Sequence, residues 1–385
     1  MIGLLNNDAP IRIGSEKGHR GLLGRFLNIP WALALAVVGV ACIGFAALYS
    51  AAGGSLDPWA RQQIIRFIPG FLVMLCIAVA DLKWVYRLAY PFWLLCVGLL
   101  VFVEVAGVIG MGAQRWINMG FINLQPSDLA KVAVVLAMAR YYHEMPIEKI
   151  RRLRSLIVPA ILTIIPVGLI VVQPDLGTSL MIVMIAAAMV FIAGAPWWLF
   201  AGGIAAAAAA IPTAFHFLHD YQKKRVLTFL NPESDPLGAG YHITQSKIAI
   251  GSGGLDGKGY LQGSQSHLNF LPEKHTDFIF TMIAEEWGFI GAMVILSLFC
   301  FIFWQGYRVA FRARYSFGRL LALGLITNYA IYIVINIGMV TGLMPVVGEP
   351  LPLISYGGTA MITALLAFGL ICAVSVNRNP NLPRG

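Results

Sequence analysis

Long runs of apolar residues alternate along the chain with shorter polar segments. Nine of these runs are long enough to cross roughly 30 Å of hydrocarbon as helices. They lie at residues 31–51, 62–80, 87–107, 155–172, 177–194, 198–217, 278–305, 316–342 and 353–377. The pattern predicts a bundle of membrane-spanning helices.

A tenth run, residues 128–143, is shorter and holds Asp128 and Lys131 in its first turn. If it also spans, most Lys and Arg residues face the cytoplasm, as the positive-inside rule requires. Without it, the basic clusters at 151–154 and 308–314 would lie on opposite sides. We therefore expect an all-α integral membrane protein of about ten transmembrane helices, with both termini cytoplasmic and a long extracytoplasmic loop, residues 218–277, between spans seven and eight.

Composition agrees with this class, because 58% of the residues are hydrophobic, 12% are charged and the mean hydropathy is +0.77. We expect a single polytopic membrane domain over residues 1–385, with residues 1–30 as a cytoplasmic segment and the first apolar run as an anchor. Basic cytoplasmic loops facing anionic lipid account for the net charge of +9, so no nucleic-acid partner is expected. The cysteines all fall in predicted spans and form no disulfide or metal pattern: Cys42, Cys76, Cys96, Cys300 and Cys372.

The most informative stretch is residues 267–290, where a polar loop enters an apolar helix. Asp277 stands at this junction, where a carboxylate is ordinarily a helix N-cap. Glu285 and Glu286 follow within the span, where ionisable groups are costly and mark sites. Glu285 is turned only about 80° from Asp277 around the helix, so the two can share a face.

Polar residues also gather in the outer segment before the tenth run, namely Arg115, Gln125, Ser127, Asp128 and Lys131. Arg115 could simply snorkel beside an interfacial tryptophan. Lys131, one turn inside a span, needs an anionic partner. Either Asp128 is that partner, or the two residues flank an anionic ligand.

Two further outer segments carry candidate groups. Asp175, in the turn at 173–179, either caps the following helix or contributes to a site. The glycine-rich stretch 251–259 suggests a phosphate cradle only weakly, because it lacks the P-loop pattern. Lys247 and Lys258, near this stretch, could meet a phosphate or remain solvated.

Taken together, the motifs closely resemble the SEDS family of membrane-embedded peptidoglycan glycosyltransferases. The matching segments span nearly the whole chain: GAQRWI, QPSD and Lys at 112–131, QPDLGTS at 173–179, QSKIAIGSGG at 245–254, LPEKHTDFIF at 271–280, AEEWG at 284–288 and PLPLISYGG at 350–358. The resemblance implies a ten-helix fold that polymerises lipid II on the outer face of the bacterial cytoplasmic membrane, beside a class B penicillin-binding protein. Two positions depart from it: Asp128 stands where the family usually has Glu, and Glu349 where it usually has an apolar residue.

Glycan polymerisation of this kind needs a base for the attacking hydroxyl and cations for the departing pyrophosphate. Asp277 is the expected base, matching the acid that the resemblance singles out. The expected substrate-binding residues are Arg115, Lys131, Lys247, Gln125, Ser127, Asp128, Asp175, Glu285 and Ser355. A divalent cation, Mg²⁺ or Mn²⁺, could bridge a carboxylate to the pyrophosphate, but nothing in the sequence fixes its ligands.

Two other classes of function stay open. A flippase or transporter of lipid-linked wall precursors would also place charges within spans, and Glu104 is the best argument for transport. A structural scaffold would explain the loops but not the buried Lys131 and Glu285.

Overall fold

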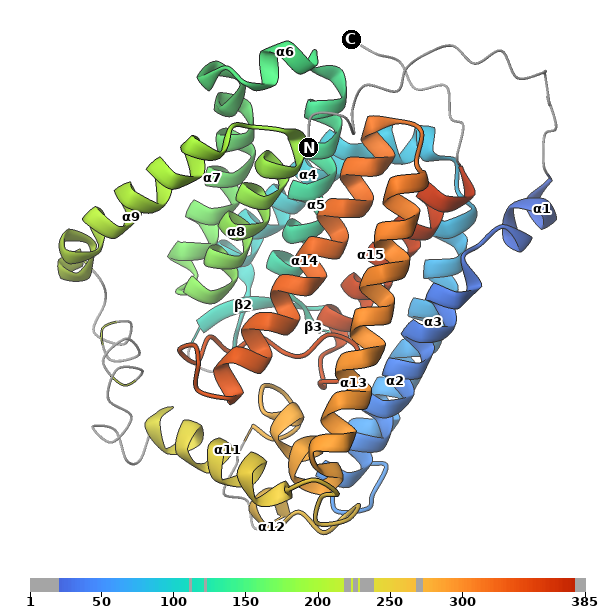
Figure 1. Cartoon of the computed structure of the whole chain (residues 1–385), viewed down its shortest axis with the longest axis vertical. Helices are drawn as coiled ribbons and strands as arrows, with labels where there is room; N and C mark the ends of the chain where they lie inside the picture. Colours follow the sequence, from blue (N-terminus) through green and yellow to red (C-terminus); the bar gives the residue numbers. More distant parts are fainter. Residues whose placement is uncertain are drawn as a thin grey trace.

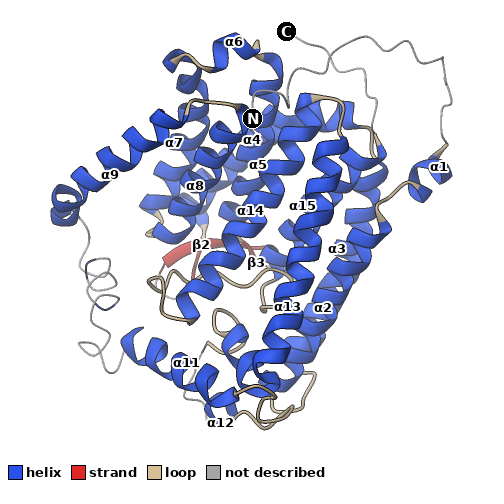
Figure 2. Ribbon diagram, viewed as in Figure 1, coloured by secondary structure: helices blue, strands red, loops and turns tan. Residues whose placement is uncertain are grey.

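The computed structural model describes residues 21–110, 113–120, 123–217, 239–267 and 273–377, together with Lys223 and Thr228. Long helices lie side by side and run between two ends of the molecule (Figure 1), with little other regular structure among them (Figure 2). The helices are α1 (Leu22–Leu27), α2 (Trp31–Ala51), α3 (Trp59–Val79), α4 (Leu82–Ala106), α5 (Pro126–Glu144), α6 (Ile147–Ile150), α7 (Ile157–Val172), α8 (Leu176–Ala193), α9 (Trp197–Phe217), α11 (Ala239–Gly253), α12 (Ser264–His267), α13 (Ile279–Arg312), α14 (Ser316–Val340) and α15 (Gly358–Val376).

Among the described residues, eight helices are long and apolar enough to cross a membrane. They are α2, α3, α4, α7 with the 3₁₀ turn before it (Leu153–Val172), α8, α13, α14 and α15. The prediction of a helical, multi-pass membrane protein is thereby confirmed. Helices α5 and α9 occupy the other two predicted spans, and the full count of ten is taken up below.

Helix α5 lies at the centre of the bundle, in contact with α4, α7, α8, α14 and α15. Nearly every residue from Pro126 to His143 is buried. A helix wrapped by protein can carry polar groups that would be too costly against lipid. This position explains how α5 can hold Asp128 and Lys131. It also explains why the apolar run of α5 is the shortest of the ten predicted spans.

A small antiparallel sheet covers the end of the bundle where α5 begins. It pairs β1 (Val108–Gly110) with β2 (Ala113–Asn118), and β2 with β3 (Asn123–Leu124). The all-helical prediction is incomplete here, because strands this short show no clear alternation of apolar and polar residues. The sheet matters because β2 carries Arg115.

Helix α13 is broken at Gly288, which has φ +65°. A Cβ at Gly288 would lie 2.3 Å from the backbone nitrogen of Gly257, so only glycine fits. Carbonyls freed by the break are satisfied from the preceding loop, since Lys258 N donates to Glu285 O at 3.0 Å and Gly259 N to Glu286 O at 3.0 Å. The described part of the 218–277 segment is therefore ordered against α13, and it includes helices α11 and α12.

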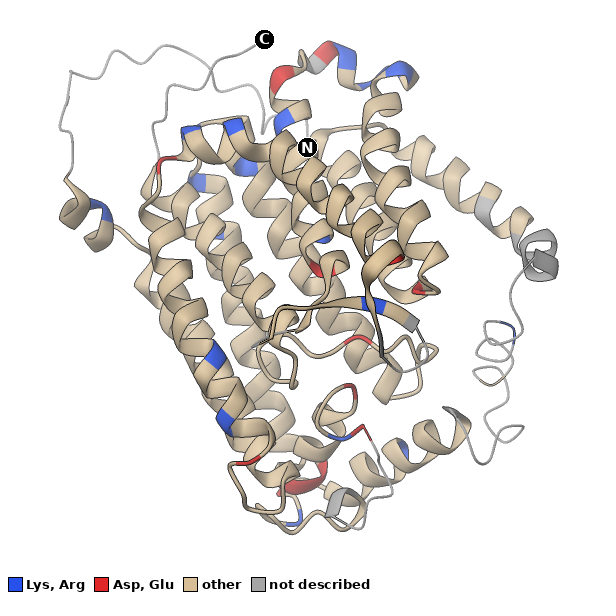
Figure 3. Ribbon diagram, turned by 180° about the vertical axis from the view of Figure 1, so that it is seen from behind, with Lys and Arg blue, Asp and Glu red and all other residues tan. Residues whose placement is uncertain are grey.

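Charges are distributed unevenly between the two ends (Figure 3). One end holds α6, the basic segment 149–154 and the turn between α13 and α14. The ends of the described chain lie there too, because Arg25 Nη1 donates to Val79 O at 3.2 Å and Asn377 Nδ2 donates to Ala80 O at 2.7 Å. Most acidic residues lie toward the opposite end.

Candidate active site

A buried polar cluster forms where α5 begins, between α8, α14 and the loop that joins α14 to α15. Lys131 is its centre and is only 1% exposed. Its Nζ lies 3.2 Å from Asp128 Oδ1 and 3.3 Å from each carboxylate oxygen of Glu349, and it also bonds the hydroxyl of Tyr332. An ammonium has three protons to donate, and here three side chains receive them. The predicted ion pair with Asp128 is present, and Glu349 is a second anionic partner.

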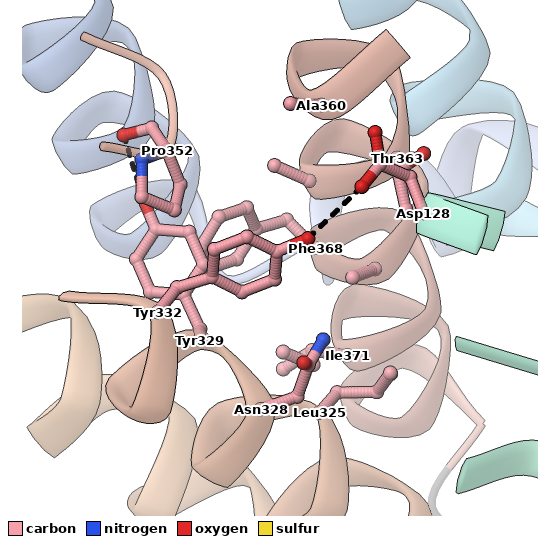
Figure 4. Close-up of a pocket in the computed structure, with 12 residues that line it drawn as sticks. Asp128, Leu325, Asn328, Tyr329, Tyr332, Pro352, Ala360, Thr363, Phe368 and Ile371 are labelled. Atoms are coloured by element: carbon pink, nitrogen blue, oxygen red, sulfur yellow. Dashed lines mark hydrogen bonds between the residues drawn. The ribbon is translucent and has the colours of Figure 1, made fainter. Parts of the chain in front are cut away.

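Tyr332, on α14, ties this cluster together. Its hydroxyl donates to Asp128 Oδ1 at 3.1 Å, so Asp128 is held by both its own helix and a neighbouring one. Beneath this pair lies a cavity of about 20 Å³, walled in part by Asn328 and Thr363 (Figure 4). Both residues bury a side-chain oxygen without a hydrogen-bond partner in the described structure. The space suits about one water molecule, whose hydrogen bonds would satisfy these oxygens.

The cluster continues outward through the start of α8. Thr178 Oγ1 lies 2.8 Å from Glu349 Oε1 and 2.9 Å from Asp175 Oδ2. Asp175 also accepts from the backbone nitrogen of Thr178 at 3.2 Å, which confirms that it caps α8. Its expected role in substrate binding stays a prediction.

Arg115 joins the far side of Asp175. Its Nη1 lies 3.9 Å from Asp175 Oδ2, its Nε donates to Gln173 O at 3.0 Å, and Nη2 donates to Pro174 O. The guanidinium is thus held against a backbone turn and remains partly exposed, at 29% of the side chain. A fixed, partly exposed guanidinium suits recognition of an anion from outside.

Asp277 lies close to the loop that carries Glu349. Helix α13 has Phe278 as its N-cap, so the interpretation of Asp277 as the capping residue is wrong. A Cβ built on Gly348 would lie 3.5 Å from Asp277 Oδ2, which places the carboxylate beside the residue that precedes Glu349. Asn336 Nδ2 bridges the two segments, donating to Asp277 O at 3.0 Å and to Glu349 O at 2.8 Å. Asp277 therefore lies beside Gly348, and Lys131 contacts the side chain of the next residue, Glu349.

The loop between α14 and α15 is bound tightly to the segment that carries Asp277. Ser355 Oγ donates to Thr276 O at 2.6 Å and accepts from Leu351 N at 2.8 Å. Tyr356 N donates to His275 O at 2.8 Å. The Ser355 hydroxyl thus fixes the loop, and its expected contact with substrate stays a prediction.

Other predicted site residues lie around this centre or away from it. Gln125 Nε2 donates to Ser127 Oγ at 3.1 Å where α5 begins. Lys247 is exposed on α11 and packs over Gly342, where a Cβ would meet its Cε at 2.2 Å. Glu285 is fully buried and accepts from Lys258 Nζ at 2.8 Å and from Gln265 N at 2.9 Å. These bonds hold the 254–265 loop, and a substrate role for Glu285 is untested.

Glu104 lies near the sheet end of α4 and its side chain is exposed. It therefore does not line a polar path through the interior of the described helices. This position removes the best sequence argument for transport.

A resident metal ion does not fit the described residues. Asp128 and Glu349 direct their carboxylates at the Lys131 ammonium, so a cation already lies between them. In the described ranges no three His, Cys, Asp or Glu side chains group to hold a metal. The divalent cation stays a prediction, without a ligand set among the described residues.

Four residues of this cluster had no role assigned from the sequence: Glu349, Tyr332, Asn336 and Thr178. A signal existed for Glu349, because an acid stands there among apolar and proline residues. Tyr332 and Asn336 give no such signal, since single polar residues are common in a span and only packing shows their partners.

Residues 27–380 match the FtsW/RodA/SpoVE family, described as cell cycle proteins. Peptidoglycan glycosyltransferase MrdB of Escherichia coli K12 is 43% identical over 333 residues, covering 86% of this chain and 89% of that protein. Peptidoglycan glycosyltransferase RodA of Treponema pallidum is 30% identical over 430 residues, covering 91% and 98%.

Solved structures agree with these relatives. A chain from a study of polymerization and crosslinking by a peptidoglycan synthase complex aligns with a TM-score of 0.81 and 33% identity, covering 91% of this chain and 98% of its own. Thermus thermophilus rod shape determining protein RodA aligns with a TM-score of 0.70 and 29% identity, covering 92% and 98%.

Proposed function

Because this chain belongs to the FtsW/RodA/SpoVE family, the SEDS proteins, we propose that it is a peptidoglycan glycosyltransferase of the RodA type, which polymerises lipid II during cell elongation. It is a multi-pass protein of the bacterial inner membrane. The observation that carries the proposal is that neighbouring residues of one loop meet both groups: the Asp277 carboxylate lies beside Gly348, and the Lys131 ammonium lies 3.3 Å from the Glu349 carboxylate.

The reaction is an inverting displacement at the anomeric carbon of the lipid-linked sugar. The attacking C4 hydroxyl of the incoming GlcNAc forms the new glycosidic bond and loses its proton to Asp277. The bond from the anomeric carbon to the lipid pyrophosphate breaks, and the leaving group departs with the electron pair. A pyrophosphate is a good leaving group that needs cations more than a general acid.

Lys131 and Arg115 are the cations that supply this stabilisation. Contacts through Glu349, Thr178 and Asp175 link the two cations, which supports their acting on one leaving group. Arg115 offers a planar fork for bidentate contact, whereas Lys131 supplies a point charge. Lys247, which packs over Gly342, is a further candidate cation, and Gln125 and Ser127 offer polar contacts for sugar hydroxyls.

The topology that suits this chemistry has ten spans, with α5 and α9 added to the eight apolar helices. The end that carries α6 and the basic segment 149–154 then faces the cytoplasm, and the end with Asp277 faces outward. Lipid II presents its sugars on the outer face, where the Asp277 segment would meet them.

The partner we propose is a class B penicillin-binding protein that crosslinks the new glycan. Support comes from the structural neighbour that belongs to a peptidoglycan synthase complex, in which polymerization and crosslinking are coordinated. Polymerisation and crosslinking act on the same glycan, so direct contact between the two proteins would bring each new strand to the crosslinking site.

The experiment that tests the proposal uses purified protein, alone and with its penicillin-binding partner, incubated with labelled lipid II. We expect labelled glycan chains that grow with time. Transport of lipid II across proteoliposome membranes without any glycan would instead favour the flippase alternative, although Glu104 no longer supports it.

A further inference from the structure

Glu349 places a second carboxylate on Lys131, and the role inferred for it rests on the proposed function. It lies in the loop between α14 and α15, is 4% exposed, and places both carboxylate oxygens 3.3 Å from Lys131 Nζ. Two oxygens at equal distance from one ammonium are what a phosphate group would also present.

The other partners of Lys131 are less able to move. Asp128 lies three residues earlier on the same helix and also accepts from Tyr332. Tyr332 lies within α14, among buried side chains. Glu349 alone of these three is carried by a loop, next to Gly348, whose φ of +82° is a turn conformation. A new anion at Lys131 must therefore displace Glu349.

We propose that the Glu349 carboxylate occupies the anion position at Lys131 and competes there with the lipid pyrophosphate. Substrate binds when Glu349 is neutralised or displaced. Glu349 is thus an affinity-determining residue of the pyrophosphate site.

Hydrogen-bond geometry shows how neutralisation can occur. The Thr178 hydroxyl has one proton, yet it lies 2.8 Å from Glu349 Oε1 and 2.9 Å from Asp175 Oδ2. Both contacts are satisfied if Glu349 carries a proton and donates to Thr178, while Thr178 donates to Asp175. A neutral Glu349 keeps the hydrogen bonds from Glu349 to Thr178 and from Thr178 to Asp175. It loses most of its electrostatic attraction to Lys131.

The charges around Glu349 make this protonation accessible near neutral pH. Burial raises the pKa of Glu349 to about 7, the Lys131 ammonium opposes the rise, and Asp175 and Asp128 add to it. Tyr332, on α14, contacts the same Lys131 ammonium. Arg115 lies on the far side of Asp175. Lower pH therefore favours the neutral form of Glu349, and higher pH favours the competing anion.

Inorganic pyrophosphate is the probe, titrated calorimetrically into purified wild-type protein and Glu349→Gln at pH 6 and pH 8. With a pKa of about 7, roughly one-eleventh of Glu349 is neutral at pH 8, so the apparent Kd of the wild-type protein for pyrophosphate is about elevenfold that of a site with a neutral residue 349. We expect the ratio of wild-type to Glu349→Gln Kd to be close to one at pH 6 and about tenfold at pH 8. Comparing variants at one pH cancels the titration of pyrophosphate itself.

Three variants make the result specific. Glu148→Gln, an exposed acid in α6, should behave as wild type at both pH values. Lys131→Met should lose pyrophosphate binding at both. If Glu349→Gln does not fold, Glu349→Leu removes the carboxylate with an apolar side chain and should show the same ratio.

A ratio near one at both pH values would overturn the inference, as would weaker binding by Glu349→Gln or no binding by it at all. Failure of the proposed function is separate, because it would appear as no glycan from lipid II whatever the ratio of pyrophosphate affinities.

Discussion

Lys131 has two roles, one in the stability of the fold and one in the proposed chemistry. Its ammonium is buried and bonded to Asp128, Glu349 and Tyr332. A charge in such a place is tolerated only with partners, and removing one member leaves the others uncompensated. The residue is therefore costly to replace even before substrate is considered.

Lys131→Met should lower stability strongly, because it leaves two buried carboxylates without their shared cation. Loss of one partner from a buried pair typically costs about 3–5 kcal/mol. The triple variant Asp128→Asn/Lys131→Met/Glu349→Gln should recover most of this loss, since no buried charge is left unpaired. Thermal unfolding in detergent measures both.

Activity separates the two roles of the same residue. If Lys131 binds pyrophosphate, the triple variant is folded and still makes no glycan from lipid II. A triple variant that regains wild-type polymerisation would reduce Lys131 to a structural ion pair.

At the residue scale, the sequence identifies groups but not most of their partners. Asp277, Lys131, Asp128 and Arg115 stand out because a charge in or beside an apolar run is costly. Glu349 could not be assigned, because 218 positions separate it from Lys131 and only folding brings them together. The N-cap reading of Asp277 depended on a helix boundary that lies one residue further on.

Among the elements, α13 connects the outer loop to the rest of the bundle through the break at Gly288. Gly288→Ala would force a Cβ into a backbone at φ +65°, and that Cβ would lie 2.3 Å from Gly257 N. We expect destabilisation well above 1 kcal/mol, because alanine can neither adopt this conformation cheaply nor fit the space. Thermal unfolding measures the effect.

Gly251→Ala is the matched control for this change. Gly251 lies in α11, and a Cβ there would meet nothing within 4 Å. Alanine should be neutral or stabilise by about 0.5–1 kcal/mol, since it favours a helix more than glycine does. Equal effects of the two substitutions would contradict the close packing assigned to the break.

The sequence predicts element boundaries where a helix must be long enough to cross lipid or the core. It does not predict them where side-chain packing sets the boundary. The run at 31–51 coincides with α2, whereas the run at 278–305 misses that α13 continues to Arg312. The additional turns carry Arg308 and Arg312 beyond the apolar run, so hydropathy does not detect them. The sequence does not predict the sheet at 108–124, because its strands are too short to show a clear alternation of apolar and polar residues.

Across the whole molecule, the separation of charges predicts which end faces which compartment. Asp256 lies in the outer loop and Glu148 in α6, and both side chains are exposed. In a variant whose native cysteines are replaced, Asp256→Cys should react with a membrane-impermeant thiol reagent in spheroplasts, which expose the outer face of the inner membrane. Glu148→Cys should react only after permeabilisation. The reverse pattern would invert the topology.

The most direct test of the central claim is lipid II polymerisation by purified Asp277→Asn, beside wild type and Asp256→Asn. Asparagine keeps the size of the side chain and removes the basic carboxylate, so the rate should fall by about 10²–10⁴-fold, the usual contribution of a general base. The thermal unfolding temperature should stay near that of wild type, and Asp256→Asn should polymerise normally. Polymerisation by Asp277→Asn at a rate close to wild type would contradict the assignment of Asp277 as the base.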